Sequence, residues 1–379
     1  MYQPPLPEKF NHLSQAEAVE LISFYKQQLA ERMVILGHHY QRDDIIQFAD
    51  FTGDSLKLSQ LAAREKDAEF IVFCGVHFMA ESADILSAEH QKVFLPDVSA
   101  GCSMADMAEI DQVEQCGEIL QQQLPHPEKL IPVTYINSSA AVKAFCGRHN
   151  GLCCTSSNCL AVFEFLWQRD PKTVVLFLPD EHLGRNTAYR YGITLDDMAL
   201  WDPYEPSGAV AAEQLAHSRM VLWKGFCSVH QEFTCEQIHK ARGEDPDVNV
   251  IVHPECCFEV AQLADYVGST EYIIKTIRAA RPGTNWVVGT EINLVNRLAR
   301  EMKQRNIKVR SLSECPCLCE TMYRIDLPHL AWLLDNLYQH CLAPDKNPFV
   351  NQIIVDEVTK RYAHQALAKM IQLTAVPVD

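Results

Sequence analysis

The sequence lacks long apolar runs, a basic leader and an excess of positive charge. Its longest apolar stretches are short pieces such as Thr173–Leu178, whereas a membrane-spanning helix needs about 20 residues. The segment Met1–Pro7 has neither a basic nor an apolar run, so we expect no signal peptide. The net charge of −16 disfavours a surface for nucleic acid or anionic lipid, because both need basic residues. We therefore expect a cytoplasmic protein that binds neither nucleic acid nor membrane.

Several familiar motifs are also absent. The chain has no G-x-G-x-x-G fingerprint of a dinucleotide site and no G-x-x-x-x-G-K-[ST] phosphate loop. It also lacks H-E-x-x-H and the paired C-x-x-C spacing, which are typical of zinc proteases and zinc ribbons. These absences disfavour the common classes of nucleotide and zinc site.

The sequence does have the pattern of an α/β protein. Its 379 residues are 47% hydrophobic, which is enough for two or three packed domains. Short β-branched runs alternate with longer amphipathic stretches, as in βα units that form parallel sheets. The predicted helices include Leu56–Glu65, Leu160–Gln168, Tyr272–Ala280 and Asn293–Gln304. The predicted strands are Met33–Gly37, Phe70–Cys74, Val93–Leu95, Ile131–Ile136, Thr173–Leu178, Met220–Trp223, Val248–Val252, Trp286–Val288 and Ile307–Val309.

Cysteine is abundant, with 15 residues. In a reducing compartment this enrichment indicates metal or cluster ligation, catalysis or simple packing. Each of three blocks of βα units ends with a strand, a short loop and a cysteine. The candidate ligands at these ends are Cys102, Cys227 and one of the group Cys315, Cys317 and Cys319. Because ligands of open α/β sheets gather at the carboxyl ends of strands, one such cysteine per domain predicts a shared site.

The predicted fold is therefore α/β, with three pseudo-threefold-related α/β/α domains, small parallel sheets and an active site at their junction. The first domain covers residues 1–105, and the C-terminal helices in 325–379 are expected to pack on it. The second covers 106–228 and the third 229–324. We interpret Asp180–Pro206, which is acidic and rich in tyrosine, as a long insertion or lid.

Three cysteine thiolates suit a [4Fe-4S] cluster with a catalytic role. A cubane held by three thiolates leaves one iron without a protein ligand, and that iron is a Lewis acid able to assist the loss of hydroxyl as water. A cluster used only for electron transfer normally has cysteine at all four positions. The three candidate positions therefore favour catalysis.

Polar side chains follow the same strands. His38, His230, His253 and Glu255 are candidates for acid and base steps, and Tyr40, Tyr135 and Asn137 for hydrogen bonds to carboxylates or enolates. Three helices also begin with hydroxyl residues after a tight loop, and the candidates there are Ser55, Ser156 and Thr270. Each could be an ordinary N-cap, but such helix starts can also hold phosphate or carboxylate.

Nearly the whole chain resembles the quinolinate synthase family, in its longer form. The matching motifs include GHHYQ (Gly37–Gln41), ADFTGDSL (Ala49–Leu56), CGVHFMAESADIL (Cys74–Leu86), LPDVSAGCSMADM (Leu95–Met107), TYINSSAAVKA (Thr134–Ala144), CTSSN (Cys154–Asn158), LPDEHLGRNTA (Leu178–Ala188), GFCSVH (Gly225–His230), HPEC (His253–Cys256), GST (Gly268–Thr270) and ETMYRIDLPHL (Glu320–Leu330). So many matches in order are not expected by chance.

The resemblance implies condensation of iminoaspartate with dihydroxyacetone phosphate to quinolinate, releasing phosphate and two waters, with a [4Fe-4S] cluster as Lewis acid in NAD biosynthesis. It also implies L-aspartate oxidase as the upstream supplier of the imine. The implied cluster ligands are Cys102, Cys227 and Cys319. Cys319 is preferred to Cys315 and Cys317 because it lies three residues before Met322, as the family's third ligand does.

The resemblance also distributes roles among the polar residues. The two carboxylates and the phosphate are expected on His38, Ser55, Tyr135, Asn137, Ser156, His253, Glu255 and Thr270. Proton transfer is expected from Tyr40, His230 and Glu255, with Glu255 as the base and Tyr40 as the acid or enolate stabiliser. Cys317 and Cys256 could form a thiol/disulfide pair.

Three other functions fit parts of the sequence. An aconitase-type iron-sulfur hydro-lyase would share the open iron but would need no phosphorylated triose. A metal sensor using the C-x-C-x-C group would normally carry a basic DNA-binding surface, which the charge disfavours. A structural zinc protein would hold zinc without labile sulfide.

Overall fold

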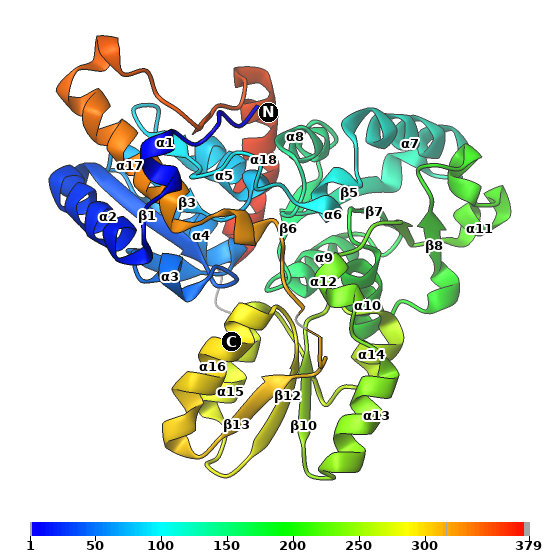
Figure 1. Cartoon of the computed structure of the whole chain (residues 1–379). Coiled ribbons are helices and arrows are strands. Elements are labelled where there is room, and N and C mark those ends of the chain that lie inside the picture. The colour runs from blue at the N-terminus through cyan, green and yellow to red at the C-terminus, as the bar shows by residue number, and fades with distance from the viewer. Residues whose placement is uncertain (1, 316, 375–379) are drawn as a thin grey trace. The chain divides into compact units, whose positions relative to one another are not determined.

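The structure is a computed structural model that describes residues 2–315 and 317–374. The chain divides into two compact units (Figure 1). One consists of the chain up to Cys102 together with Leu318–Asp356, and the other of Ser103–Cys317 together with the chain from Glu357 onward. Within the described residues, no helix combines the length and the apolar character that a membrane crossing requires.

The first unit has one five-stranded sheet in the order β14-β4-β3-β1-β2. All neighbours are parallel except β14, which pairs antiparallel with β4. The strands are β1 (Met33–His38), β2 (Phe51–Gly53), β3 (Phe70–Cys74), β4 (Lys92–Phe94) and β14 (Gln352–Ile353). The helices are α1 (Glu8–Asn11), α2 (Gln15–Leu29), α3 (Asp43–Ile46), α4 (Ser55–Arg64), α5 (His77–Leu86) and α17 (Leu327–Leu342).

Helix α17 packs against α2, and α4 packs against α5. The core on the α2 and α17 side includes Ile22, Phe70, Phe94, Leu330 and Leu334, all nearly inaccessible to solvent. Burying such side chains stabilises a fold by about 1.5–3 kcal/mol each. A helix from the C-terminal part of the chain therefore completes the core of the first sheet.

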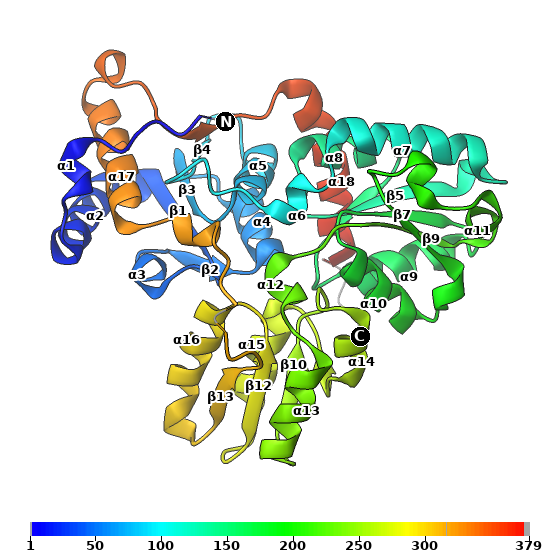
Figure 2. The same ribbon diagram turned by 45° about the vertical axis from the view of Figure 1, so that its right-hand side comes forward.

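The second unit contains two all-parallel sheets. The first has the order β6-β5-β7-β9-β8, with α7 and α8 over one face and α9 and α10 over the other (Figure 2). Its strands are β5 (Leu130–Tyr135), β6 (Leu152–Cys154), β7 (Val174–Leu178), β8 (Met198–Trp201) and β9 (Met220–Trp223). Its helices are α6 (Ser103–Asp106), α7 (Ile110–Gln123), α8 (Ala140–Arg148), α9 (Cys159–Arg169), α10 (Glu181–Tyr191), α11 (Ala212–His217) and α12 (Ser228–Gln231).

The other sheet of this unit has the order β11-β10-β12-β13. Its strands are β10 (Asn249–Val252), β11 (Tyr266–Val267), β12 (Asn285–Gly289) and β13 (Lys308–Ser311). Helices α13 (Cys235–Glu244) and α14 (Phe258–Leu263) contact each other, as do α15 (Thr270–Ala279) and α16 (Ile292–Met302). Alternating strands and helices give parallel sheets because each helix carries the chain back to the start of the next strand.

The structure confirms the predicted α/β class, with three small and mostly parallel sheets flanked by helices. All nine predicted strands are present, with small differences at their ends. The domain limits 1–105, 106–228 and 229–324, and the pseudo-threefold relation with a junction site, stay predictions.

Helix α18 (Glu357–Thr374) packs on α8 and β6 of the second unit, whereas we expected the C-terminal helices in 325–379 to pack on the first domain. Its buried residues Ala363, Ala366, Leu367 and Met370 form one helical stripe that needs an apolar partner. The segment Asp180–Pro206 is not a lid, because it forms α10 and the edge strand β8, which pairs with β9.

Candidate functional site

Three buried side chains of the second unit form the centre of the candidate site. Glu255 Oε2 lies 2.7 Å from His230 Nδ1 and 3.8 Å from His253 Nδ1. The two imidazole rings stack with their centroids 4.5 Å apart, and none of the three side chains is more than 3% exposed. His230 lies in α12, just after β9, whereas His253 and Glu255 follow β10. The carboxyl ends of parallel strands thus supply the whole group, as is usual for α/β folds.

A second layer of hydroxyl groups surrounds this centre. The Tyr135 hydroxyl, at the end of β5, hydrogen-bonds Glu255. His253 Nε2 lies 3.2 Å from Ser156 Oγ. Because the backbone N–H of Glu255 donates to His253 Nδ1 at 3.4 Å, that nitrogen is the acceptor, and Nε2 carries the proton toward Ser156. Tyr135, Ser156, His253 and Glu255, all nominated from the sequence, are therefore neighbours.

The site holds its charges in a defined pattern. Burial opposes ionisation of Glu255, but His253 and His230 together with the hydrogen bonds from His230 and Tyr135 outweigh it and lower the pKa of Glu255 to about 2. Burial lowers the pKa of His253 to about 3, against the opposing influence of Glu255. At neutral pH the carboxylate is an anion and His253 is neutral. The arrangement can accept a proton at Glu255 and donate one from His253 Nε2.

Asp180 is a second buried carboxyl group that interacts with Glu255. It is fully buried, and burial together with the charge of Glu255 raises its pKa well above the usual range. Its Oδ1 accepts the backbone N–H of Leu183 at 2.6 Å and so caps α10. Its Oδ2 has no hydrogen-bond partner within the described part of the chain. Two interacting carboxyl groups thus have pKa values shifted in opposite directions, an arrangement typical of functional centres.

Cys227 completes a donor set at the same place. Its thiol, the imidazole of His230 and the carboxylate of Glu255 present ligand atoms within 4.8 Å of one another. Sulfur, nitrogen and oxygen in this combination suit transition metals. Cys227 is half-buried and precedes α12 directly.

The first unit carries the other nominated residues. His38 is the last residue of β1, and its ring contacts that of Tyr40 edge to face with centroids 4.8 Å apart. The backbone N–H of Tyr40 donates to His38 Nδ1 at 3.2 Å. Cys102 and Cys319 are half-buried, and Cys319 Sγ lies 3.5 Å from Thr321 Oγ1. These residues follow the carboxyl ends of strands or lie in loops, as in the second unit.

Other residues occupy the N-cap positions at the three nominated helix starts, and Asn158 at the start of α9 makes no side-chain cap hydrogen bond. Asp54 caps α4 and Ser269 caps α15 through side-chain hydrogen bonds, so Ser55 and Thr270 are first helical residues. Ser156 lies in the turn before α9, facing His253. The capping explanation therefore does not account for these hydroxyls. Asn137, in the turn after β5, is half-buried, and its Oδ1 has no hydrogen-bond partner among the described residues.

The cysteines differ in how deeply they are buried. Cys74, Cys146, Cys153, Cys154 and Cys256 are fully buried, and burial raises the pKa of each thiol. Such thiols resist forming the thiolate that binds metals. The three nominated ligands are instead half-buried, as are Cys235, Cys257 and Cys341. Cys256 and Cys317 are both free thiols in the structure, as are Cys257 and Cys315.

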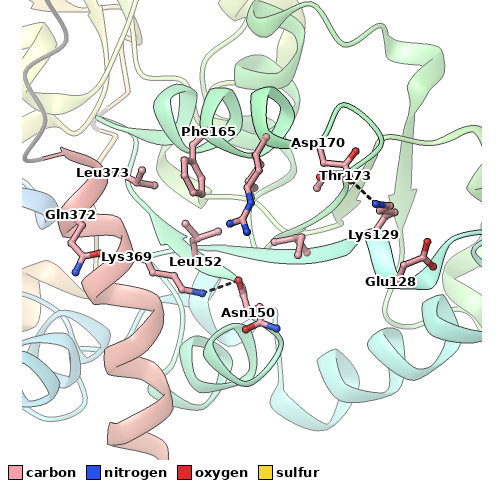
Figure 3. Close-up of a pocket in the computed structure, with 13 residues that line it drawn as sticks. Glu128, Lys129, Asn150, Leu152, Phe165, Asp170, Thr173, Lys369, Gln372 and Leu373 are labelled. Atoms are coloured by element: carbon pink, nitrogen blue, oxygen red, sulfur yellow. Dashed lines mark hydrogen bonds and ion pairs between the residues drawn. The ribbon is translucent and has the colours of Figure 1, made fainter.

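A cavity of about 680 Å³ lies at the other end of the β6-β5-β7-β9-β8 sheet. Figure 3 shows Lys129, Thr173, Asn150 and Lys369 around it. Lys129 and Thr173 lie at the amino ends of β5 and β7, whereas Tyr135 and Asp180 follow the carboxyl ends of the same strands. Lys129 is paired with Asp170 at 2.6 Å, and Lys369 donates to the carbonyl of Asn150 at 3.0 Å. None of the nominated residues lines this cavity.

Comparison with known proteins identifies the family of the chain. Residues 20–372 match a family model described as quinolinate synthetase A protein. The chain belongs to the quinolinate synthetase A family. It is 50% identical to a quinolinate synthase of Geobacillus sp. (strain WCH70) over 97% of this chain and 96% of the relative. It is 51% identical to a quinolinate synthase of Acidobacterium capsulatum over 93% and 92%, and 50% identical to one of Streptomyces coelicolor over 92% and 86%.

Three residues beside the centre were not nominated from the sequence. Asp180 caps α10 and Asn186 lies within it, and Thr290 Oγ1 lies 3.1 Å from His230 Nε2. Signals for α10 were present, because Asp180 is a good N-cap residue and Gly192 ends the helix in the left-handed conformation with φ 112°. Thr290 follows the predicted strand Trp286–Val288 at the same kind of position as His253 after β10.

Proposed function

We propose that the protein is a quinolinate synthase, which joins iminoaspartate to dihydroxyacetone phosphate and releases quinolinate, phosphate and two waters. The observation that carries this proposal is the buried centre, in which an ionised Glu255 lies against His230 and beside Cys227. About half of the residues are identical to relatives named quinolinate synthase. The product would enter NAD biosynthesis, and an L-aspartate oxidase would supply the imine.

Glu255 is the proposed base. Ring formation needs protons removed from carbon next to carbonyl or imine groups, and an anionic carboxylate shielded from water is suited to that step. His230 Nδ1, at 2.7 Å, would pass the proton on or hold the carboxylate in place. Tyr40 is the proposed acid or enolate stabiliser, fixed against His38 by their ring contact.

Hydroxyl, amide and imidazole groups are proposed to hold the two carboxylates and the phosphate. In the second unit these are Tyr135, Asn137, Ser156, His253 and Thr270, and in the first His38 and Ser55. Ser55 and Thr270 are first residues of helices, where backbone N–H groups favour anions. The Oδ1 of Asn137, which has no hydrogen-bond partner among the described residues, would accept a hydrogen bond from a substrate hydroxyl or imine N–H.

Cys102, Cys227 and Cys319 are the proposed ligands of a [4Fe-4S] cluster. The donor chemistry fits, because these thiols are half-buried, whereas the thiols buried among apolar residues resist deprotonation. When bound, such a cluster would supply an open Lewis-acidic iron for the loss of hydroxyl groups as water. The chain's own residues would orient the substrates, exclude water and move the protons.

The test is quinolinate formation by anaerobically purified, cluster-reconstituted protein given both substrates, followed by chromatography. We expect product from the wild type, and loss of both product and iron in Cys102→Ser, Cys227→Ser and Cys319→Ser. Cys315→Ser is the matched control and should keep both. Full iron and sulfide without product would favour an aconitase-type hydro-lyase instead. Zinc without labile sulfide would point to a structural zinc protein.

A further inference from the structure

The Glu255–His230 contact joins two separate sheets of the second unit. His230 follows β9 in the β6-β5-β7-β9-β8 sheet, while Glu255 follows β10 in the β11-β10-β12-β13 sheet. A distance of 2.7 Å between their side chains therefore depends on how two loops are aligned. A shift of about 1 Å in a catalytic group can cost about 100-fold in rate. Some element must fix this alignment.

Helix α10 contacts both loops. The backbone N–H of Glu181 donates to the carbonyl of Gly225 at 2.9 Å. His182 Nε2 lies 2.9 Å from the Oε1 of Gln231, the last residue of α12. These contacts hold the segment that carries His230. The helix itself is seated closely on the sheet, because a Cβ at Gly184 would meet Leu222 and Phe177 at 2.6 Å.

Asn186 on the same helix holds the other loop. Its Nδ2 donates to the carbonyl of Pro254 at 2.9 Å and to that of Cys256 at 2.8 Å. These carbonyls belong to the residues immediately before and after Glu255. Asn186 is 6% exposed, so loss of its amide would leave two carbonyls without this donor in a region closed to water. No apolar residue of similar size could replace both donors.

We propose that Asn186 is a positioning residue, which clamps the backbone on both sides of Glu255 and so keeps the Glu255 carboxylate against His230 Nδ1. The contacts of α10 with Gly225 and Gln231 fix His230 from the other side. Asn186 touches no reacting atom and acts through Glu255. The catalytic consequence rests on the proposed function, in which Glu255 is the base, whereas the clamp itself does not.

The kinetic test compares Asn186→Ala with Asn336→Ala. Asn336 is a matched control in α17, because its side chain also makes two hydrogen bonds to loop backbone, with the carbonyl of Pro348 at 3.1 Å and the N–H of Val350 at 3.0 Å. We expect Asn186→Ala to lower kcat about 10- to 100-fold with little change in KM. Asn336→Ala should lower Tm without lowering kcat. Asn186→Ser is measured in parallel in case the alanine variant does not fold.

A double-mutant cycle with Glu255→Asp separates positioning from general damage. If Asn186 acts through Glu255, Asn186→Ala should cost much less in the Glu255→Asp protein than in the wild type. Additive losses, or an unchanged kcat in Asn186→Ala, would overturn the proposal.

A spectroscopic measurement makes the clamp testable without turnover. In the full chain labelled with ¹⁵N-histidine, the Nδ1–H of His230 bonded to a carboxylate should give a low-field proton resonance, assigned by its loss in His230→Asn. We expect Asn186→Ala to remove or shift this resonance and Asn336→Ala to leave it. A resonance unchanged in Asn186→Ala would refute the clamp. If the clamp holds but the wild type makes no quinolinate, only the proposed function fails.

Discussion

Two glutamates of the second unit, Glu255 and Glu291, follow the neighbouring parallel strands β10 and β12 and are almost wholly buried. Glu255 lies against two imidazoles, and its pKa falls to about 2. Glu291 caps α16, where it accepts the backbone N–H groups of Asn293 and Leu294. Burial outweighs these hydrogen bonds and raises the pKa of Glu291 to about 8.

The difference shows that burial alone does not decide the charge of a carboxyl group. Both side chains have lost nearly all contact with water, which favours the neutral acid. Two adjacent imidazoles and a tyrosine hydroxyl reverse that preference for Glu255. For Glu291, three hydrogen bonds from the helix start and the charge of Arg297 do not. One sheet edge therefore holds an ionised carboxylate and a carboxylic acid that caps a helix.

The largest expected contrast is in turnover. Glu255→Gln should lower the rate of quinolinate formation by about 10²- to 10⁴-fold, because it removes the proposed base. Glu291→Gln should change the rate less than about threefold, because glutamine resembles the protonated acid that is already present. Both variants are compared by steady-state kinetics at equal iron content. Near-normal turnover of Glu255→Gln with an intact cluster would show that Glu255 is not the base.

A smaller contrast is expected in the pH dependence of stability. Glu291 titrates near 4.5 when unfolded and at about 8 when folded. Between these values the folded chain binds more protons, so stability falls as pH rises. From about pH 5 to about pH 7 we expect this group to cost about 2 kcal/mol in the free energy of unfolding. Denaturant unfolding should show this slope in the wild type and not in Glu291→Gln.

Glu255 should behave in the opposite way. Its folded pKa of about 2 lies below 4.5, so its stabilisation is present above about pH 4.5 and is lost as the pH falls further toward 2. Glu255→Gln should therefore leave the slope between about pH 5 and about pH 7 unchanged. Parallel slopes for the wild type and Glu291→Gln in that range would contradict the assignment of a neutral Glu291.

The sequence predicted the sheet interiors better than their edges. The nine predicted strands include every interior strand of the three sheets. The five missed strands are β2, β6, β8, β11 and β14, and each is a sheet edge. They are two to four residues long, too short to show a hydrophobic period, and pairing with one neighbour depends on tertiary contacts.

The residues of the candidate site could be nominated from the sequence, but their charge states could not. His230, His253 and Glu255 were nominated because they are polar groups that follow predicted strands. The carboxyl ends of parallel strands lie at one edge of a sheet. The same rule would have nominated Glu291 after β12, and nothing in the local sequence separates the two glutamates. Their charges depend on partners from other segments, such as Tyr135 and His230 for Glu255. Asn186 was missed because its role depends on a contact nearly 70 residues away in sequence.

The smallest effect should come from Arg297, a half-buried residue of α16 whose charge lowers the pKa of Glu291. Removing that charge in Arg297→Gln should raise the pKa of Glu291 further, so the fall in stability should extend to higher pH. The added difference should be less than about 1 kcal/mol, because the charge is partly screened by solvent. Arg300→Gln is the matched control on the same helix, since its charge is not among those that shift Glu291. Denaturant unfolding above neutral pH measures the difference, and equal curves for the two arginine variants would show that burial alone keeps Glu291 protonated.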